Sequence, residues 1–150
     1  MAIKELDMNF VVDGVDYFPQ HGSEYSAGYD LKACFEQPEV MLWPGETLKI
    51  STGIKIAIPE GYCGLVLPRS GLATKRGLRP ANTPGLIDSD YRGDVIVALH
   101  NDSPSPQKVT RGERIAQLVI IPYMKINFKP VDSLDETDRG EGGFGSTGSK

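Results

Sequence analysis

The chain has 150 residues with a formal net charge of −4, and 39% of its residues are hydrophobic. This length fits one domain that buries an apolar core without disulfides or metal ions. The negative charge excludes broad nucleic-acid binding, which needs a basic surface, and no apolar run approaches the roughly 20 residues of a transmembrane helix. The N-terminal sequence MAIKELDMNF lacks the charged-then-apolar order of a signal peptide, so we expect a cytoplasmic protein with no membrane contact.

The two cysteines, Cys34 and Cys63, have neither metal-ligand spacing nor a secretory context. We expect both to be small buried hydrophobic residues, with reactive thiol chemistry as the alternative.

Alternating apolar and polar residues dominate the chain and predict β-strands. In the segment 47–59, aliphatic residues share one parity, while lysines and a serine occupy the other. The segment 94–101 is apolar on both faces, which is typical of a central strand or a subunit contact. The segment 124–128 alternates again and predicts a further half-buried strand.

Glycine and proline pairs separate these segments at roughly ten-residue spacing and leave little room for helices. One short helix is predicted at 70–76, where good helix formers follow a proline. The pattern predicts an all-β fold, a jelly-roll-like distorted β-barrel or sandwich. Apolar residues become scarce from Asp132 onward, so we expect a packed body at 1–131 and a mobile glycine-rich arm at 132–150.

Polar residues in unexpected places mark the candidate sites, and the first is Asp30 in the strand-like run AGYDLKA. An acid there caps a turn or orients a metal-bound water, and taken alone the structural role is favoured. Next comes LPRSGLA, where Arg69, Ser70 and Gly71 present a guanidinium, a hydroxyl and free helix amides. These groups predict an anion site, and the alternative is an N-cap by Ser70 beside a surface arginine.

The segment NTPGLIDSDYRGDV is the most informative internal stretch. If it is extended, Asp88 and Asp90 share one face and Tyr91 points to the other. A carboxylate there can take a proton from water, and the aromatic ring can pack against a sugar. The alternative is an Asp-rich hairpin.

In RGERIAQLVIIP, the amide of Gln117 interrupts an apolar strand and needs hydrogen-bond partners, so we expect it to face a polar site. Arg114 is a phosphate donor or, as the favoured alternative, a salt-bridge partner of a nearby acid. The C-terminal RGEGGFGSTG offers Arg139 as a phosphate ligand and Phe144 as a lid over a flat ring. The alternative there is an idle glycine-rich tail.

Together, AGYDL, PRSGLA, GLIDSDYRG, GERIAQLV and RGEGGFGSTG resemble, in this order, the five motifs of the homotrimeric deoxyuridine triphosphatase (dUTP nucleotidohydrolase) family. Five short motifs in register over 150 residues form a far more specific signal than any one of them. The resemblance spans roughly residues 27–148, and the region before Ser26 matches least well.

The resemblance implies hydrolysis of dUTP to dUMP and pyrophosphate, with Mg²⁺ on the phosphates and water attacking the α-phosphorus. By this likeness Asp88 activates the water, Tyr91 packs on the deoxyribose, and Asn82 belongs to the uracil pocket. Asp30 is implied to hold a water of the magnesium shell. The other residues implied in substrate binding are Arg69, Ser70, Gly71, Gln117, Arg139, Phe144, Gly145, Ser146 and Thr147.

The resemblance also implies a homotrimer whose sites combine motifs from different subunits. Two rivals remain: a deoxycytidine triphosphate deaminase, which shares the fold but lacks the IDSDY arrangement, and a catalytically silent nucleotide-binding or signalling protein on the same scaffold.

Overall fold

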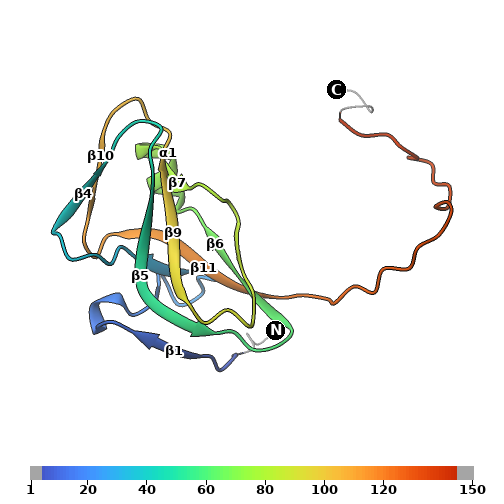
Figure 1. The fold of residues 1–150 in the computed structure, drawn as a ribbon, viewed down its shortest axis with the longest axis horizontal. Helices are drawn as coiled ribbons and strands as arrows, with labels where there is room; N and C mark the ends of the chain where they lie inside the picture. Colours follow the sequence, from blue (N-terminus) through green and yellow to red (C-terminus); the bar gives the residue numbers. More distant parts are fainter. Residues whose placement is uncertain (1–4, 145–150) are drawn as a thin grey trace.

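The computed structural model describes residues 5–144, which form antiparallel β-strands with one short α-helix in that range (Figure 1). The helix α1 spans Ser70–Arg76, and a 3₁₀ turn, η1, spans Val15–Tyr17. The strands are β1 (Asn9–Val12), β2 (Gln20–His21), β3 (Tyr29–Lys32), β4 (Glu39–Leu42), β5 (Thr47–Ala57), β6 (Tyr62–Leu67), β7 (Leu78–Pro80), β8 (Gly85–Ile87), β9 (Asp94–Asn101), β10 (Gln107–Thr110) and β11 (Arg114–Pro122).

These strands form two larger sheets and one two-stranded ladder. The first sheet has the order β1-β5-β9-β7, the second has the order β2-β3-β11-β6-β8, and β10 pairs with β4. The chain crosses between the two larger sheets repeatedly, because β6 follows β5 and β9 follows β8. The predicted all-β, jelly-roll-like fold is confirmed, in its sandwich form, since the sheets of the described residues do not close into a barrel.

The predicted strand periodicities are borne out in both long strands of the first sheet. In β5 the aliphatic side chains of Ile50, Ile54 and Ile56 are buried, whereas Lys49 and Lys55 are exposed. The strand β9 lies between β5 and β7, so the predicted central position is confirmed, although Ile96 on its second apolar face is 47% exposed.

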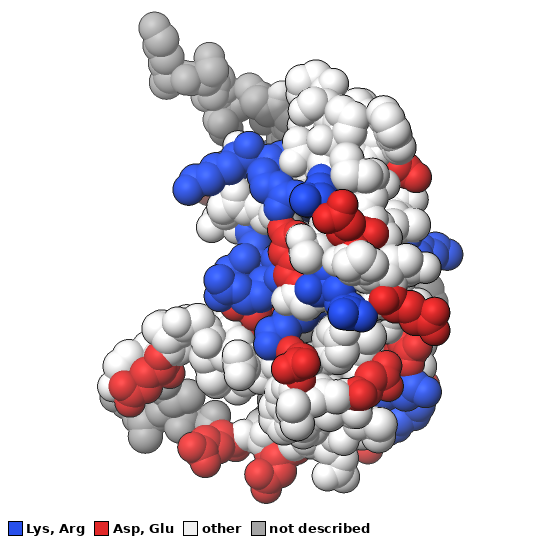
Figure 2. Space-filling model, turned by 90° about the vertical axis from the view of Figure 1, so that its left-hand side faces the viewer, with Lys and Arg blue, Asp and Glu red and all other residues white. Residues whose placement is uncertain are grey.

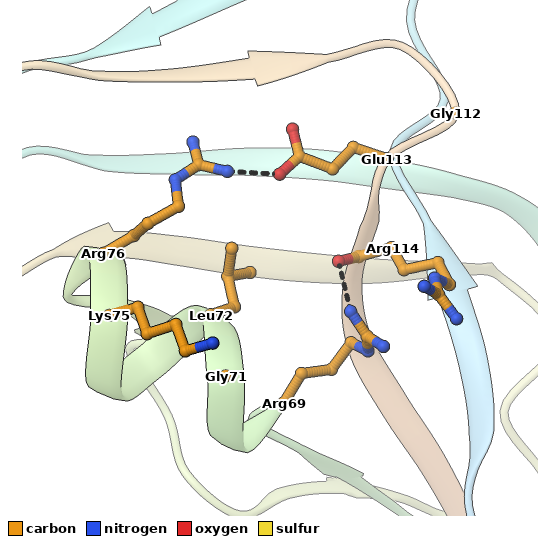
Figure 3. Close-up of a pocket in the computed structure, with 8 residues that line it drawn as sticks. All are labelled: Arg69, Gly71, Leu72, Lys75, Arg76, Gly112, Glu113 and Arg114. Atoms are coloured by element: carbon orange, nitrogen blue, oxygen red, sulfur yellow. Dashed lines mark hydrogen bonds and ion pairs between the residues drawn. The ribbon is translucent and has the colours of Figure 1, made fainter. Parts of the chain in front are cut away.

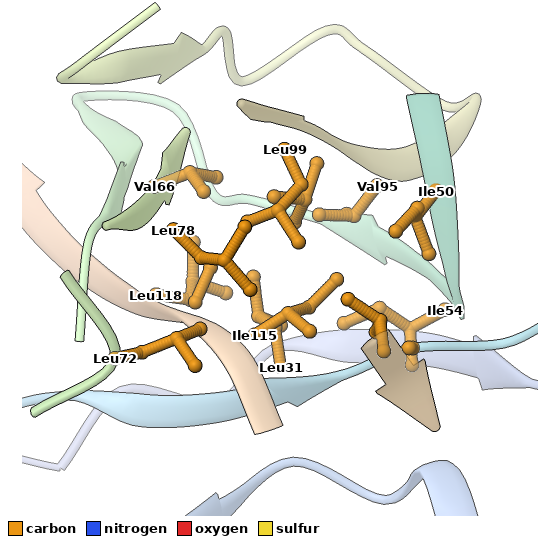
Figure 4. Packing of buried hydrophobic residues seen from close by; sticks show 14 of the residues in the cluster. Leu31, Ile50, Ile54, Val66, Leu72, Leu78, Val95, Leu99, Ile115 and Leu118 are labelled. Atoms are coloured by element: carbon orange, nitrogen blue, oxygen red, sulfur yellow. The ribbon is translucent and has the colours of Figure 1, made fainter. Parts of the chain in front are cut away.

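Buried side chains from both larger sheets belong to a single apolar cluster (Figure 4). Val95 and Leu99 enter it from β9, Val66 from β6 and Leu118 from β11, and Leu72 adds the buried side of α1. Because apolar burial supplies most of the driving force for folding, this shared core fixes the strand ends that carry the polar motifs.

The helix α1 forms where it was predicted and ends at Gly77, whose φ of +66° is a left-handed conformation that glycine adopts without strain. Its N-cap residue is Arg69, with no side-chain cap, and Ser70 is the first helical residue. The alternative that Ser70 caps the helix is therefore wrong. No helix among residues 5–144 is both long and apolar enough to span a bilayer.

Of the two cysteines, Cys63 is buried and Cys34 is half-buried, and neither forms a disulfide. The expectation of a small buried residue is thus met at Cys63 and only partly met at Cys34.

The prediction of a half-buried strand at 124–128 is wrong. The last strand, β11, ends at Pro122, and the chain then runs away from the two sheets as an extended segment (Figure 1). Met124, Ile126 and Phe128 are 89%, 66% and 85% exposed. The alternation is real, but no strand within residues 5–144 pairs with this segment.

A buried amide at the end of β9 organises the connection to β10. Asn101 Nδ2 donates to the carbonyl oxygens of Leu42 and Ser105 at 3.0 and 2.9 Å. Its Oδ1 accepts from the backbone N–H of Ser103 at 2.9 Å and from the Ser103 hydroxyl at 2.7 Å. A fully buried side chain that satisfies four polar groups cannot be replaced by an apolar one without stranding them.

We expect Asn101→Leu to lower the free energy of unfolding by about 2–3 kcal/mol, because several buried polar groups lose their partners. Urea denaturation followed by circular dichroism measures this change. Lys49→Met, at an exposed position of β5, is the matched control and should shift the midpoint little. Equal midpoints for Asn101→Leu and wild type would refute the role of this amide.

Candidate active site

A buried carboxylate joins two arginines from distant parts of the chain. Arg69 Nε donates to Asp30 Oδ1 at 2.8 Å, and Arg114 Nη1 donates to Asp30 Oδ2 at 3.1 Å. Asp30 lies on β3, Arg69 at the junction of β6 and α1, and Arg114 at the start of β11. A buried charge is costly unless it is paired, so this trio is held in place by its own electrostatics. The salt bridge predicted for Arg114 is confirmed.

Beside this trio lies a pocket of about 540 Å³ between α1 and the start of β11 (Figure 3). Four cationic side chains line it, and two carboxylates are paired with them: Glu113 with Arg76, and Asp30 with Arg69 and Arg114. The cations outnumber the carboxylates, so the pocket favours an anion. Its lining residues are Arg69, Gly71, Leu72, Lys75, Arg76, Gly112, Glu113 and Arg114.

The surface charge agrees with a local anion site on an acidic protein. Figure 2 shows Lys and Arg side chains gathered over the upper and middle part of the face on which β4 and β10 lie, with Asp and Glu spread around them. The chain as a whole carries a net charge of −4, so the attraction for anions is confined to such groups of cations.

Gln117 lies opposite Asp30 in the pairing of β11 with β3. It is half-buried, and its Nε2 donates to the carbonyl oxygen of Pro68 at 2.9 Å, so the predicted need for a partner is confirmed. Gly28 packs against the same amide, and a Cβ at position 28 would overlap Gln117 Oε1. A side chain at position 28 would therefore force this amide to move.

A second cavity, of about 200 Å³, lies at the crossing from β8 to β9. Asp88 and Tyr91 both line it, and the N–H of Tyr91 donates to the carbonyl of Asp88 at 3.2 Å. Residues 88–91 therefore form a turn. The extended conformation in which Asp88 and Asp90 would share one face is not the one that forms. The hairpin alternative is also wrong, since β8 pairs with β6 whereas β9 pairs with β5 and β7.

The ring of Tyr91 is held in this cavity at its hydroxyl end and packs closely against Gly93. Its hydroxyl donates to the carbonyl of Asp94 at 2.9 Å, and a Cβ at Gly93 would overlap the hydroxyl oxygen. An aromatic ring anchored at its polar end presents a rigid wall to whatever binds beside it.

The remaining predicted residues of the described range do not line either cavity. Ser70 is exposed at the start of α1, and Asn82 is exposed in the loop between β7 and β8. Arg139 Nε donates to the carbonyl of Gly142 at 2.8 Å, and Phe144 is fully exposed, both on the extended C-terminal segment. Gly145, Ser146 and Thr147 lie outside the described residues.

The structure brings Asp30, Arg69, Arg114 and Gln117 together and puts Asp88 and Tyr91 elsewhere. The two cavities have no lining residue in common. Lys75 was missed at the sequence level, although it stands four residues after Gly71 and so shares its helix face.

An all-β sandwich with an arginine-lined anion pocket and a separate carboxylate–tyrosine cavity has the features of a nucleotide-binding protein. A family model described as dUTPase matches residues 17–148. The chain belongs to the dUTPase family, and it is an enzyme of that class, a dUTP nucleotidohydrolase.

Named relatives agree along nearly the whole length. The deoxyuridine 5'-triphosphate nucleotidohydrolase of Burkholderia cenocepacia is 48% identical over 134 residues, 89% of this chain and 90% of that protein. That of Cutibacterium acnes is 47% identical over 131 residues, 87% of this chain and 84% of the relative. Among solved structures, a mutant dUTPase of Staphylococcus bacteriophage 80alpha with dUpNHpp has a TM-score of 0.84 at 29% identity, covering 95% of this chain and 98% of that one.

We expect Gly28→Ala to lower kcat/KM for dUTP by about tenfold, because the added methyl group displaces the Gln117 amide from Pro68. Steady-state pyrophosphate release measures the effect. Gly14→Ala is the matched control, because the nearest atom to its Cβ lies at 3.9 Å. Equal kcat/KM for Gly28→Ala and Gly14→Ala would contradict the packing argument.

Proposed function

We propose that this protein hydrolyses dUTP to dUMP and pyrophosphate by attack of water on the α-phosphorus. In this role it limits incorporation of uracil into DNA and supplies dUMP for synthesis of dTMP. The observation that carries the proposal is the pairing of Asp88 with an anchored Tyr91 in one cavity of a dUTPase-family chain.

Asp88 is the proposed general base and takes the proton from the attacking water. Its position at a turn between two sheets supports this role, because both flanking strands are anchored by backbone pairing. Tyr91 is proposed to pack on the deoxyribose. Because the hydroxyl of Tyr91 is hydrogen-bonded, its ring cannot easily move aside. The 2′-hydroxyl of a ribose would clash with the ring, which favours deoxyribose over ribose.

The cationic pocket is proposed to hold the phosphates. Arg69, Ser70 and Gly71 surround the α–β region, and Gln117 donates to a neighbouring oxygen. Guanidinium groups in fixed positions stabilise the charge that develops on the departing pyrophosphate. The pairing of Arg69 with Asp30 supports this role, because it fixes the guanidinium before substrate arrives.

Mg²⁺ is the proposed cofactor. Residues 5–144 contain no group of three or more His, Cys, Asp and Glu side chains that could hold a metal, and both oxygens of Asp30 already accept from arginines. The protein side chains of the described range thus do not fit a metal cage, and the proposed ligands are phosphate oxygens of the substrate. A water-mediated contact of Asp30 with the ion stays a prediction.

The C-terminal segment is proposed to close the site. In this proposal Arg139 meets the γ-phosphate, Phe144 stacks on uracil, and Gly145, Ser146 and Thr147 add donors. Ordering a segment costs about 1–2 kcal/mol per residue, which a triphosphate offsets better than a monophosphate. Release of dUMP then follows from the loss of the outer phosphates.

A homotrimer with shared sites is proposed as the working form. Two observations support it: the phosphate pocket and the Asp88 cavity have no common lining residue, and three apolar side chains stand exposed on the extended segment. If neighbouring chains contribute one cavity each, the two meet at a subunit boundary. A strand-like segment with an apolar face can be buried on an adjacent chain.

The central test is Asp88→Asn assayed with dUTP and Mg²⁺. We expect turnover to fall by about 10²–10⁴-fold while the affinity for a non-hydrolysable dUTP analogue stays within about twofold, because the amide cannot accept the proton. Single-turnover pyrophosphate release and calorimetric titration measure the two quantities.

Asp90→Asn is the matched control for this test and should retain most of the activity. Loss of analogue binding in Asp88→Asn would assign Asp88 a structural role. Ammonia release from dCTP by the wild type would instead favour the deaminase, and analogue binding without any dUTP turnover would favour a silent nucleotide-binding protein.

The oligomeric proposal predicts that Met124→Ser combined with Phe128→Ser lowers the mass in solution. The wild type should elute at three times the chain mass of 16.3 kDa, measured by light scattering, because apolar side chains are buried between chains. Replacing Lys125 and Lys129 with serine is the control at alternate positions. A wild-type monomer at micromolar concentration would contradict the trimer.

A further inference from the structure

We propose that Arg79 is a positioning residue for recognition of the base. Together with Thr83 it holds the backbone carbonyl of Pro80 and thereby fixes the loop that carries Asn82. This inference rests on the proposed function, in which Asn82 belongs to the uracil pocket.

The Pro80 carbonyl receives donors from both sides of the loop. Arg79 Nη1 donates to it at 3.2 Å, and the Thr83 hydroxyl donates to it at 2.6 Å. The loop is also tied at its first residue, because the N–H of Ala81 donates to the carbonyl of Ala98 on β9 at 2.7 Å. Asn82 therefore stands between two anchored residues, and its backbone has little freedom to move away.

Arg79 is itself held by a carboxylate beyond the end of β9. Its Nη2 donates to Asp102 Oδ1 at 3.2 Å, and its Nε donates to Asp102 Oδ2. Asp102 is anchored in turn, since its N–H donates to the carbonyl of Gly77 at 2.8 Å. These bonds from Arg79 hold the pKa of the Asp102 carboxyl below its ordinary value, so the pair is charged at neutral pH.

The network continues across the first sheet. His100 Nε2 lies 3.2 Å from Asp102 Oδ1, and His100 Nδ1 lies 2.8 Å from the hydroxyl of Thr47. His100 pairs with Arg79 on one side and with Thr47 on the other. Three neighbouring strands thus fix the guanidinium that reaches the loop.

A simple tie between β7 and β9 is the competing role for this ion pair. The side chains of Arg79 and Asp102 are 39% and 45% exposed, and pairs that face water to this degree add little to stability. A bidentate guanidinium–carboxylate contact is, however, geometrically specific. The remaining nitrogen of the guanidinium, Nη1, donates to the Pro80 carbonyl, so the ion pair also fixes the position of the loop.

The test is Arg79→Met, which keeps much of the side-chain length and removes every donor. We expect KM for dUTP to rise by about three- to tenfold, kcat to stay within about twofold, and the ratio of kcat/KM for dUTP over dTTP to fall by a similar factor. Lys108→Met is the matched control, because Lys108 pairs with Glu39 at 3.1 Å with side chains 56% and 50% exposed. That variant should keep both KM and the dUTP preference.

Two further variants keep the test decisive. Thr83→Val removes the second donor to Pro80 and should lower the dUTP preference in the same direction, which decides the matter if Arg79→Met does not fold. Asp102→Asn added to Arg79→Met should cause little further loss, because the Asp102 carboxylate acts on the loop through Arg79.

The outcomes separate this inference from the function on which it rests. A wild type that does not hydrolyse dUTP would overturn the proposed function. An active wild type with unchanged KM and dUTP preference in both Arg79→Met and Thr83→Val would overturn the positioning role alone, even if the melting temperature falls.

Discussion

The contact of Asp30 with two arginines is the interaction on which the cationic pocket depends. It joins β3, the junction before α1 and the start of β11, which are three segments far apart in the sequence. Removing the carboxylate would leave two guanidinium groups close together without a counter-charge. The arginines are thus presented to the pocket by a negative partner that is itself shielded from water.

The regular part of the fold follows from period-two patterns that local physics fixes. In β5 the isoleucines and lysines separate cleanly because one face meets the core and the other meets water. The same pattern at 124–128 could not be interpreted alone, because alternation indicates a partner surface without saying which chain supplies it. The pairing of the strands could not be predicted either, because no local sequence feature indicates that β8 and β9 belong to different sheets.

Part of the site could be predicted from the residue types alone. The need of Gln117 for a partner followed from the cost of burying an amide. The pairing of Arg114 with an acid followed from the preference of an isolated arginine for a salt bridge. The turn at Asp88 did not follow, because its geometry is set by the crossing between sheets. The contact of Gly28 with Gln117 could not be predicted either, because the two residues are far apart in the sequence and meet only in the folded chain.

The arginine-lined pocket on an acidic chain has a consequence for which anions can reach it. At physiological ionic strength, charges are screened beyond about 8 Å, so an approaching anion senses only the charges nearest to it. A compact triphosphate that enters the pocket, as proposed above, meets four cationic side chains, three of which are held by Asp30 or Glu113. A long polyanion must also bring its remaining charges close to the rest of a chain whose net charge is −4, so the proposed site favours small anions over long ones.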